Sequence, residues 1–128
     1  MKDNIIKKLS FNFAVRVVNL NKYLCLHKSE FVLSMQLFRS GTSVGAMIRE
    51  AEHAESKIDL KHKMSIAQKE INETIYWLAL LKETEYLSKE EFQSLEKDAV
   101  EIIKLITAII KSLNLIFWMR SSFCFIYH

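Results

Sequence analysis

The stretch SEFVLSMQLFRSGTSVGAMIREAEHAES, from Ser29 to Ser56, decides the fold of this 128-residue chain. Its middle is rich in small residues, and it holds Gly41 and Gly45, the only two glycines in the sequence. Glycine inside a helix costs about 1 kcal/mol relative to alanine. Two glycines four residues apart share one helix face and let a neighbouring helix approach closely. We therefore predict one long helix over residues 29–56, in which Gly41 and Gly45 pack against another helix.

The composition of the whole chain favours an all-helical domain. The sequence has no proline and only two glycines, whereas folds built on β-sheets need turn residues at many points. Hydrophobic residues make up 50% of the chain and the formal net charge is +3, which is not the composition of a disordered protein. The length is that of one domain with a substantial core.

Heptad patterns predict three further helices. Alternating spacings of three and four residues are typical of helices that pack in a bundle. One such seam consists of Leu60, Met64, Ala67, Ile71, Thr74, Leu78 and Leu81. A second consists of Phe92, Leu95, Ala99, Ile102, Ile106, Ile109 and Leu113. A less regular stripe over residues 4–27 consists of Ile6, Phe13, Val17, Leu20 and Leu24.

A serine precedes each of the last three predicted helices and is a candidate N-cap. The pairs of cap and acidic residue are Ser29 with Glu30, Ser56 with Asp59, and Ser88 with Glu91. We expect corners near residues 27–30, 56–58 and 86–89, and no strand. Short corners force antiparallel neighbours, so the sequence predicts an up-down-up-down antiparallel four-helix bundle over residues 1–114.

The tail at residues 115–128, LIFWMRSSFCFIYH, is rich in aromatic residues. Only eight uncharged positions separate Lys111 from Arg120, whereas a membrane span needs about 20 apolar residues. We expect no membrane anchor. The sequence favours a helix that continues into Trp118, with the rest packed on the bundle or on a neighbouring subunit, and a frayed end is the alternative.

The first helix is the basic part of the chain. Residues 2–28 carry six lysine or arginine residues and one aspartate, which gives six minus one, or +5. Cations in this pattern can contact phosphates without reading bases. The residues that we expect to bind nucleic acid are Lys7, Lys8, Arg16 and Lys22. The alternative is an ordinary solvated helix face.

Several helices carry more apolar surface than one bundle core needs. In the first helix, Phe11, Val15, Val18 and Leu26 lie off the main stripe. Wide apolar faces on a soluble helix imply a second surface that becomes buried. We therefore expect a homo-oligomer.

No catalytic pattern is recognisable, and we expect neither an enzyme nor a cofactor. Glu50 with His53 and Asp59 with His62 have the spacing of metal ligands in bundles, but no second acidic pair is predicted to face them, so we expect no metal. Two cysteines, Cys25 and Cys124, make no disulfide framework. Together with a polar start to the chain, this usage predicts a cytoplasmic protein.

Residues 31–81 resemble the small bacterial bundle proteins called 23S rRNA intervening-sequence, or S23-type, proteins. The matching motifs are LS-x-QL-x-RSGTSVGA from Leu33 to Ala46, EAEHAESK from Glu50 to Lys57, and IAQKEINETIYWL from Ile66 to Leu78. The accessory variability protein of diversity-generating retroelements is similar to this family. Met47 departs from the family pattern, which usually has asparagine there, and Arg49 stands where an acidic or neutral residue is common.

The resemblance implies a four-helix bundle without enzymatic activity that assembles into a homopentamer and has a suspected role in binding nucleic acid. The first functional hypothesis is therefore a nucleic-acid-binding accessory protein, acting as a homo-oligomeric ring and presenting RNA or DNA to a partner such as a reverse transcriptase. The second hypothesis is a structural oligomer or a protein–protein interaction module that binds no nucleic acid.

Overall fold

A computed structural model describes the backbone of residues 2–127 and the side chains of residues 5–122. Over the described backbone the chain is helical and has no strand. Its four helices are α1 (Lys2–Lys28), α2 (Val32–Ala51), α3 (Lys57–Glu83) and α4 (Lys89–Tyr127). The predicted all-α class is confirmed.

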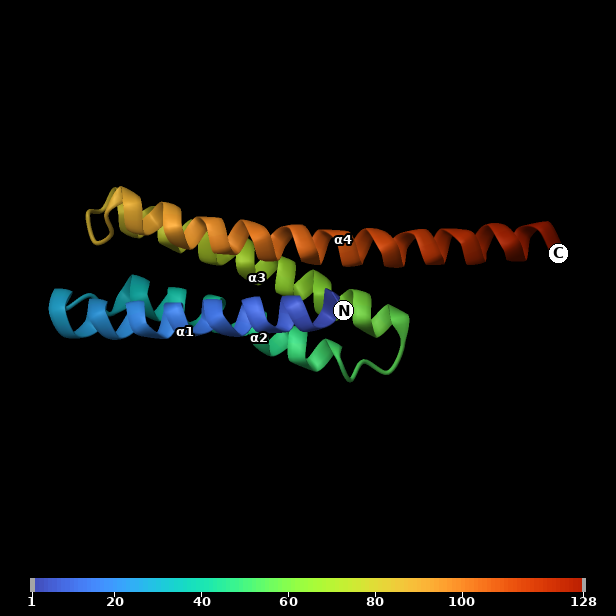
Figure 1. Ribbon diagram of the computed structural model, residues 1–128, viewed down its shortest axis with the longest axis horizontal. Helices are drawn as coiled ribbons and strands as arrows, with labels where there is room; N and C mark the ends of the chain where they lie inside the picture. The colour runs from blue at the N-terminus through green and yellow to red at the C-terminus, as the bar shows by residue number, and fades with distance from the viewer. Residues whose placement is uncertain (1, 128) are drawn as a thin grey trace.

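The four helices form an antiparallel up-down-up-down bundle (Figure 1). Each helix packs on its neighbours in the chain, and α4 returns to contact α1. Within the described part of the chain, no Cα atoms of the diagonal pairs α1–α3 and α2–α4 approach within 8 Å of each other. Helix α4 is the longest, and its C-terminal part projects beyond the other three helices (Figure 1). The predicted topology is confirmed.

The predicted seams line the core. All of the α3 seam from Met64 to Leu81 is buried, as is the α4 seam apart from Ile109, which is half-buried. One polar pair lies among these residues, where the hydroxyl of Thr74 donates to the hydroxyl of Ser40 at 2.9 Å. Both side chains are fully buried, and their mutual hydrogen bond offsets the cost of removing them from water. This pair joins α2 to α3.

Gly41 and Gly45 both face α1. A Cβ atom added at Gly41 would lie 2.8 Å from both methyl carbons of Val17, closer than side-chain carbons approach. A Cβ atom added at Gly45 would lie 3.4 Å from the carbonyl oxygen of Ser10, an ordinary van der Waals distance. The α1–α2 contact is therefore tightest at Gly41, where Val17 occupies the space of a side chain.

The corner between α1 and α2 differs from the prediction, because Glu30 and not Ser29 caps α2. The Glu30 carboxylate accepts hydrogen bonds from the backbone N–H groups of Val32 (3.1 Å), Leu33 (2.8 Å) and Ser34 (2.7 Å). Ser29 instead has a left-handed backbone with φ of 50°. A glutamate side chain is long enough to cap from outside the first turn, so the residue whose carboxylate caps the helix is one position later than the serine that we predicted.

The other two corners contain the predicted caps. Ser56 accepts the N–H of Asp59 at 3.0 Å, although α2 ends at Ala51 and the corner therefore begins earlier than expected. Hydrogen bonds from Lys63 and from the N–H of Glu55 lower the pKa of Asp59. Ser88 and Glu91 form a complete capping box, in which each side chain accepts the other residue's N–H at 3.0 Å.

Helix α4 continues past Asn114 and through Trp118 to Tyr127. After Gly45 the sequence contains neither glycine nor proline, the residues that most often end a helix. Leu115, Trp118 and Met119 are exposed, whereas Ile116 and Phe117 are half-buried. Cys124 lies outside the described side chains.

Candidate nucleic-acid interface

The four cations predicted to bind nucleic acid do not form one cluster. Lys7 lies on the side of α1 next to α2, where its ammonium is 3.1 Å from the carboxylate of Glu52. Arg16 lies on the side next to α4 and pairs with Asp98 at 2.6 Å. Lys8 and Lys22 are exposed on the outward face of α1, and no ion pair holds either of them within the described residues. Two of the four predicted residues are thus available to a ligand without breaking a contact.

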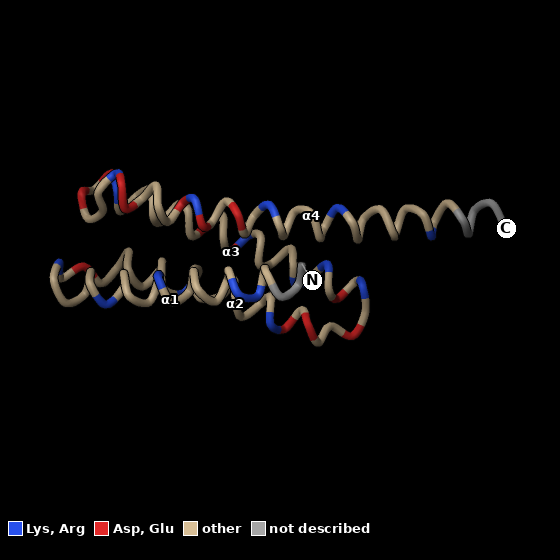
Figure 2. The backbone as a smooth tube through the Cα atoms, viewed as in Figure 1, with Lys and Arg blue, Asp and Glu red and all other residues tan. Residues whose placement is uncertain are grey.

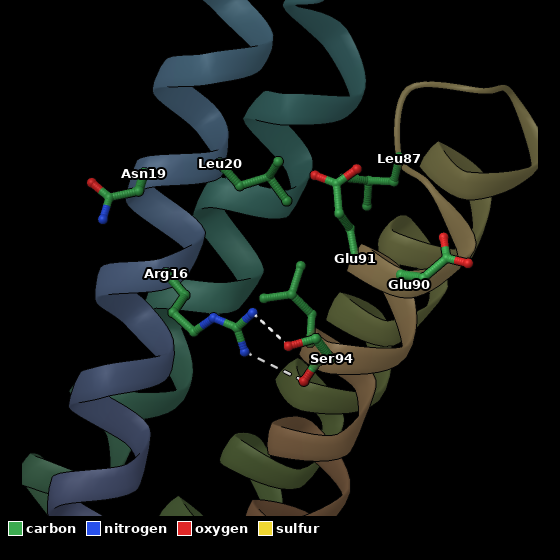
Figure 3. Close-up of a pocket in the computed structure, with 8 residues that line it drawn as sticks. Arg16, Asn19, Leu20, Leu87, Glu90, Glu91 and Ser94 are labelled. Carbon is green, nitrogen blue, oxygen red and sulfur yellow. Dashed lines mark hydrogen bonds between the residues drawn. The ribbon is translucent and has the colours of Figure 1, made fainter.

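Arg16 connects α1 to α4 through several polar contacts. Besides the Asp98 pair, its guanidinium donates to the hydroxyl of Ser94 at 2.9 Å and to the carbonyl of Ser94 at 3.3 Å. Figure 3 shows this side chain reaching across from α1 to Ser94. The ion pair is about 40% exposed, so its contribution to stability is at most about 1 kcal/mol. The sequence offered no sign of this pairing, because the partners lie far apart along the chain.

A shallow groove of about 500 Å³ opens beside Arg16 between α1 and α4. Leu20, Leu87 and Leu95 supply its apolar surface. Glu90 and Glu91 lie on the α4 side of the groove (Figure 3). Two carboxylates at its edge repel phosphates, so the groove is less suited to a nucleic-acid backbone than the exposed lysines are.

The cations of α2 are also partly engaged. Arg39 bonds to Glu70 and Glu73 of α3, and the hydrogen bond to Glu73 is the main cause that raises the pKa of Arg39. Arg49, where the chain departs from the family pattern, lies over the ring of Phe11 at 5.7 Å from its centre. Both arginines therefore join neighbouring helices.

A row of lysines on α4 was not among the residues predicted from the sequence. Lys97, Lys104 and Lys111 are seven residues apart, are all exposed, and form no ion pair within the described residues. The spacing was visible in the sequence, since seven residues return to the same helix face. The sequence alone does not show whether such lysines are free or pair with another helix, and the structure shows that these three are exposed.

An exposed apolar face extends over α1 and α2, and we call it the α1–α2 face. On α1 it includes three of the residues that lie off the core stripe, and on α2 it includes residues from the first two turns and the corner before them. Its members are Phe11, Val15, Leu26, Phe31, Val32, Met35 and Phe38, each at least 37% exposed. Large apolar side chains gathered on exposed helix faces indicate a candidate interaction site.

The polar residues considered as metal ligands do not come together. In the part of the chain that the structure describes, no three histidine, cysteine or carboxylate side chains lie close enough to hold a metal ion. Asp59 is engaged with Lys63 and with the backbone of Glu55. Cys25 is half-buried, with its sulfur 3.6 Å from the hydroxyl of Ser34.

Among the described residues, one helix is long and apolar enough to cross a membrane, and it is α4 over Lys89–Ser122. Length and composition alone give this result, and 17% of the apolar 18-residue window is buried inside the structure. Ala99, Ile102 and Ile106 of the same helix lie in the bundle core.

Comparison with known proteins places the chain among small helical proteins. The family model for the 23S rRNA-intervening sequence protein matches residues 2–108. A crystal structure of a protein of unknown function from the S23 ribosomal protein family of Bacteroides thetaiotaomicron is 55% identical, with a TM-score of 0.86, and the match covers 87% of this chain and 99% of that one. The comparison with curated proteins found no match.

Proposed function

Because the chain belongs to the family of 23S rRNA-intervening sequence proteins, we propose that it is a non-enzymatic homo-oligomer that binds nucleic acid through backbone phosphates. The observation that carries this proposal is the set of exposed lysines without acidic partners on the outward faces of α1 and α4, within the described residues. Contacts of this kind bind the backbone of RNA or DNA and carry no sequence information.

The α1–α2 face supports the oligomeric part of the proposal. A second copy of the chain would remove its exposed phenylalanine and methionine side chains from water, at roughly 25 cal/mol for each Å² buried. The likeness to the family suggests five copies. A pentamer would carry five times the protomer charge of +3, which strengthens the attraction for a polyanion.

Of the four cations predicted on α1, the proposal relies on Lys8 and Lys22. Lys7 and Arg16 each hold a carboxylate of another helix, and a phosphate would have to displace it. Lys22 lies among the apolar residues of the α1–α2 face. Its long side chain can cover apolar surface while the ammonium stays in solvent, so the proposal requires that a second copy covers the apolar residues and leaves this ammonium at the edge of the interface.

The alternative function is a protein–protein interaction module. The groove between α1 and α4 favours it, because an apolar surface beside Glu90 and Glu91 suits a basic peptide better than a nucleic acid. The two functions are compatible in an accessory protein that brings RNA or DNA to a protein partner. A reverse transcriptase is the partner that the likeness to the retroelement accessory protein suggests.

The salt dependence of binding tests the proposed function. Each phosphate neutralised contributes a slope of about −0.7 to −0.9 to the dependence of log affinity on log salt concentration. We expect the double variant Lys8→Gln/Lys22→Gln to bind RNA more weakly, with a shallower slope and unchanged helix content by circular dichroism. Fluorescence anisotropy with labelled RNA over a salt series measures the affinity and its dependence on salt.

The matched control is Lys69→Gln/Lys89→Gln, which removes two exposed lysines from other surfaces and leaves the same net charge. An equal loss in the control and the test variant would mean that only total charge matters. No binding by the wild-type protein at low salt would exclude the nucleic-acid function, and would leave the interaction module as the better explanation.

A further inference from the structure

The row of exposed side chains that begins at Lys97 continues along the outward face of α4 at intervals of seven residues, and its last three members are considered as one set. They are Lys104, Lys111 and Trp118, and Trp118 is 66% exposed. Seven residues of helix rise about 10.5 Å and complete almost two full turns, so the three side chains form a straight row. We call this row the α4 row. It lies on the side of α4 away from the core, whereas the residues of the α1–α2 face belong to α1, to α2 and to the corner between them.

The charge along α4 is segregated. All five acidic residues of this helix lie at or before Glu101, and from Ile102 to the end the sequence has Lys104, Lys111 and Arg120 without an acidic residue. Figure 2 shows the same division, with lysine and arginine but no acidic position along the second half of α4. From α3, Lys61 adds a cation at this end, where its ammonium lies 5.8 Å from the ring centre of Phe117. Lys111 and Trp118 therefore lie in a positive environment, whereas Lys104 has Glu101 one turn before it.

Trp118, which follows the two lysines along α4, is exposed in a way that would let its ring stack on a base. The other tryptophan of the chain, Trp77, is half-buried, and its indole nitrogen is inaccessible to solvent. Trp118 instead presents its ring to solvent, where a flat aromatic surface can stack on an unpaired base. The interval of about 10.5 Å also matches three nucleotides of a stacked strand at about 3.4 Å each.

We propose that the α4 row binds single-stranded nucleic acid, with phosphates on Lys104 and Lys111 and a base stacked on Trp118. A duplex fits less well, since its bases are already stacked and paired. This inference rests on the proposed function and adds the form of the nucleic acid and the helix that holds it. Lys111 and Trp118 follow the part of the chain that the family model matches, so the site belongs to this chain and not to the family pattern.

The test uses the full chain, a short fluorescein-labelled oligothymidylate, and two kinds of variant. For Lys104→Gln/Lys111→Gln we expect the salt slope to fall by about 1.4, because each phosphate of a single strand that a lysine neutralises adds about 0.7 to the slope. For Trp118→Leu we expect affinity to fall about tenfold, within the range known for a base stacked on an aromatic ring. Tryptophan fluorescence should be quenched by the oligonucleotide in the wild-type protein and remain unchanged in Trp118→Leu. Lys69→Gln/Lys89→Gln is again the control of equal charge.

Three results would overturn the inference, and they can be told apart. If Lys104→Gln/Lys111→Gln binds like the wild type while Lys8→Gln/Lys22→Gln binds weakly, the proposed function stands and the α4 row is not the site. If the wild-type protein binds labelled duplex RNA but no oligothymidylate at low salt, this inference fails and the proposed function stands, whereas both proposals fail if it binds neither. If Trp118 fluorescence responds to vesicles of anionic phospholipid and not to the oligonucleotide, the α4 row binds a membrane surface and the inference is wrong.

Discussion

Replacing Gly41 with leucine is expected to lower the free energy of unfolding by about 3 kcal/mol, the upper end of the usual cost of overpacking. Even the first carbon of a side chain at this position lies 2.8 Å from both methyl carbons of Val17. Val17 is fully buried and β-branched, so its side chain has no free rotamer into which to withdraw. The leucine side chain should push α1 away from α2. Urea denaturation at one fixed protein concentration measures the resulting loss in the free energy of unfolding.

Alanine substitutions at the two glycines provide the matched control. Gly45→Ala places its Cβ at an ordinary distance of 3.4 Å from the Ser10 carbonyl oxygen and removes a helical glycine, so it should leave stability unchanged or raise it by up to about 1 kcal/mol. Gly41→Ala should destabilise, and should cost less in a Val17→Ala background, where the methyl groups are gone. Equal tolerance of alanine at both sites would mean that the tight contact is not at Gly41.

Replacing Gly45 with leucine should lower the free energy of unfolding by about 1–3 kcal/mol, because the longer side chain meets the α1 backbone. The same urea denaturation measures this loss.

Replacing Glu30 with alanine is expected to destabilise the protein by about 2–3 kcal/mol, because three backbone donors lose a charged partner in a place where water has little access. The carboxylate is the hydrogen-bond acceptor for three N–H groups in the first turn of α2, and Glu30 is only 8% exposed. Thermal or urea unfolding monitored by circular dichroism measures the loss.

The neighbouring residue gives the control for Glu30. If Ser29 were the cap, as its sequence context indicated, then Ser29→Gly would remove the capping hydroxyl. With φ of 50° at Ser29, glycine instead relieves a left-handed conformation, and we expect stability to stay the same or rise by about 1 kcal/mol. A large loss in Ser29→Gly together with a small loss in Glu30→Ala would reverse this assignment of the cap.

The parts of the fold that the sequence predicted are those that depend on local periodicity. The seams from Met64 to Leu81 and from Phe92 to Leu113 face the core because each helix buries a stripe set by its own repeat. The capping box of Ser88 and Glu91 was predictable for the same reason, since both partners lie within one turn. The up-down topology then follows from corners of a few residues.

The features that the sequence did not predict depend on which side chains of different helices meet in the folded bundle. The pairing of Arg16 with Asp98 joins residues from opposite ends of the chain and removes a cation that looked available. Lys7 is engaged in the same way by Glu52. The α4 row was not predicted because heptad-spaced lysines on an outward face look like solubilising residues until the structure shows that they are exposed and form no ion pair within the described residues.

The length of α4 has a different cause. The sequence favoured a helix that continues into Trp118 and left a frayed end as the alternative, because a change of composition does not end a helix without a glycine, a proline or a cap. The result is a projecting segment with Leu115, Trp118 and Met119 in solvent.

Size-exclusion chromatography with light scattering, run with and without single-stranded RNA at low salt, tests most directly whether this chain is an oligomer that binds nucleic acid. We predict a peak of several times the 15.0 kDa protomer mass, five times for the ring that the family likeness suggests, and a further increase in mass when RNA is added. A stable 15.0 kDa monomer at micromolar concentration whose mass does not change with RNA would contradict both parts of the proposal.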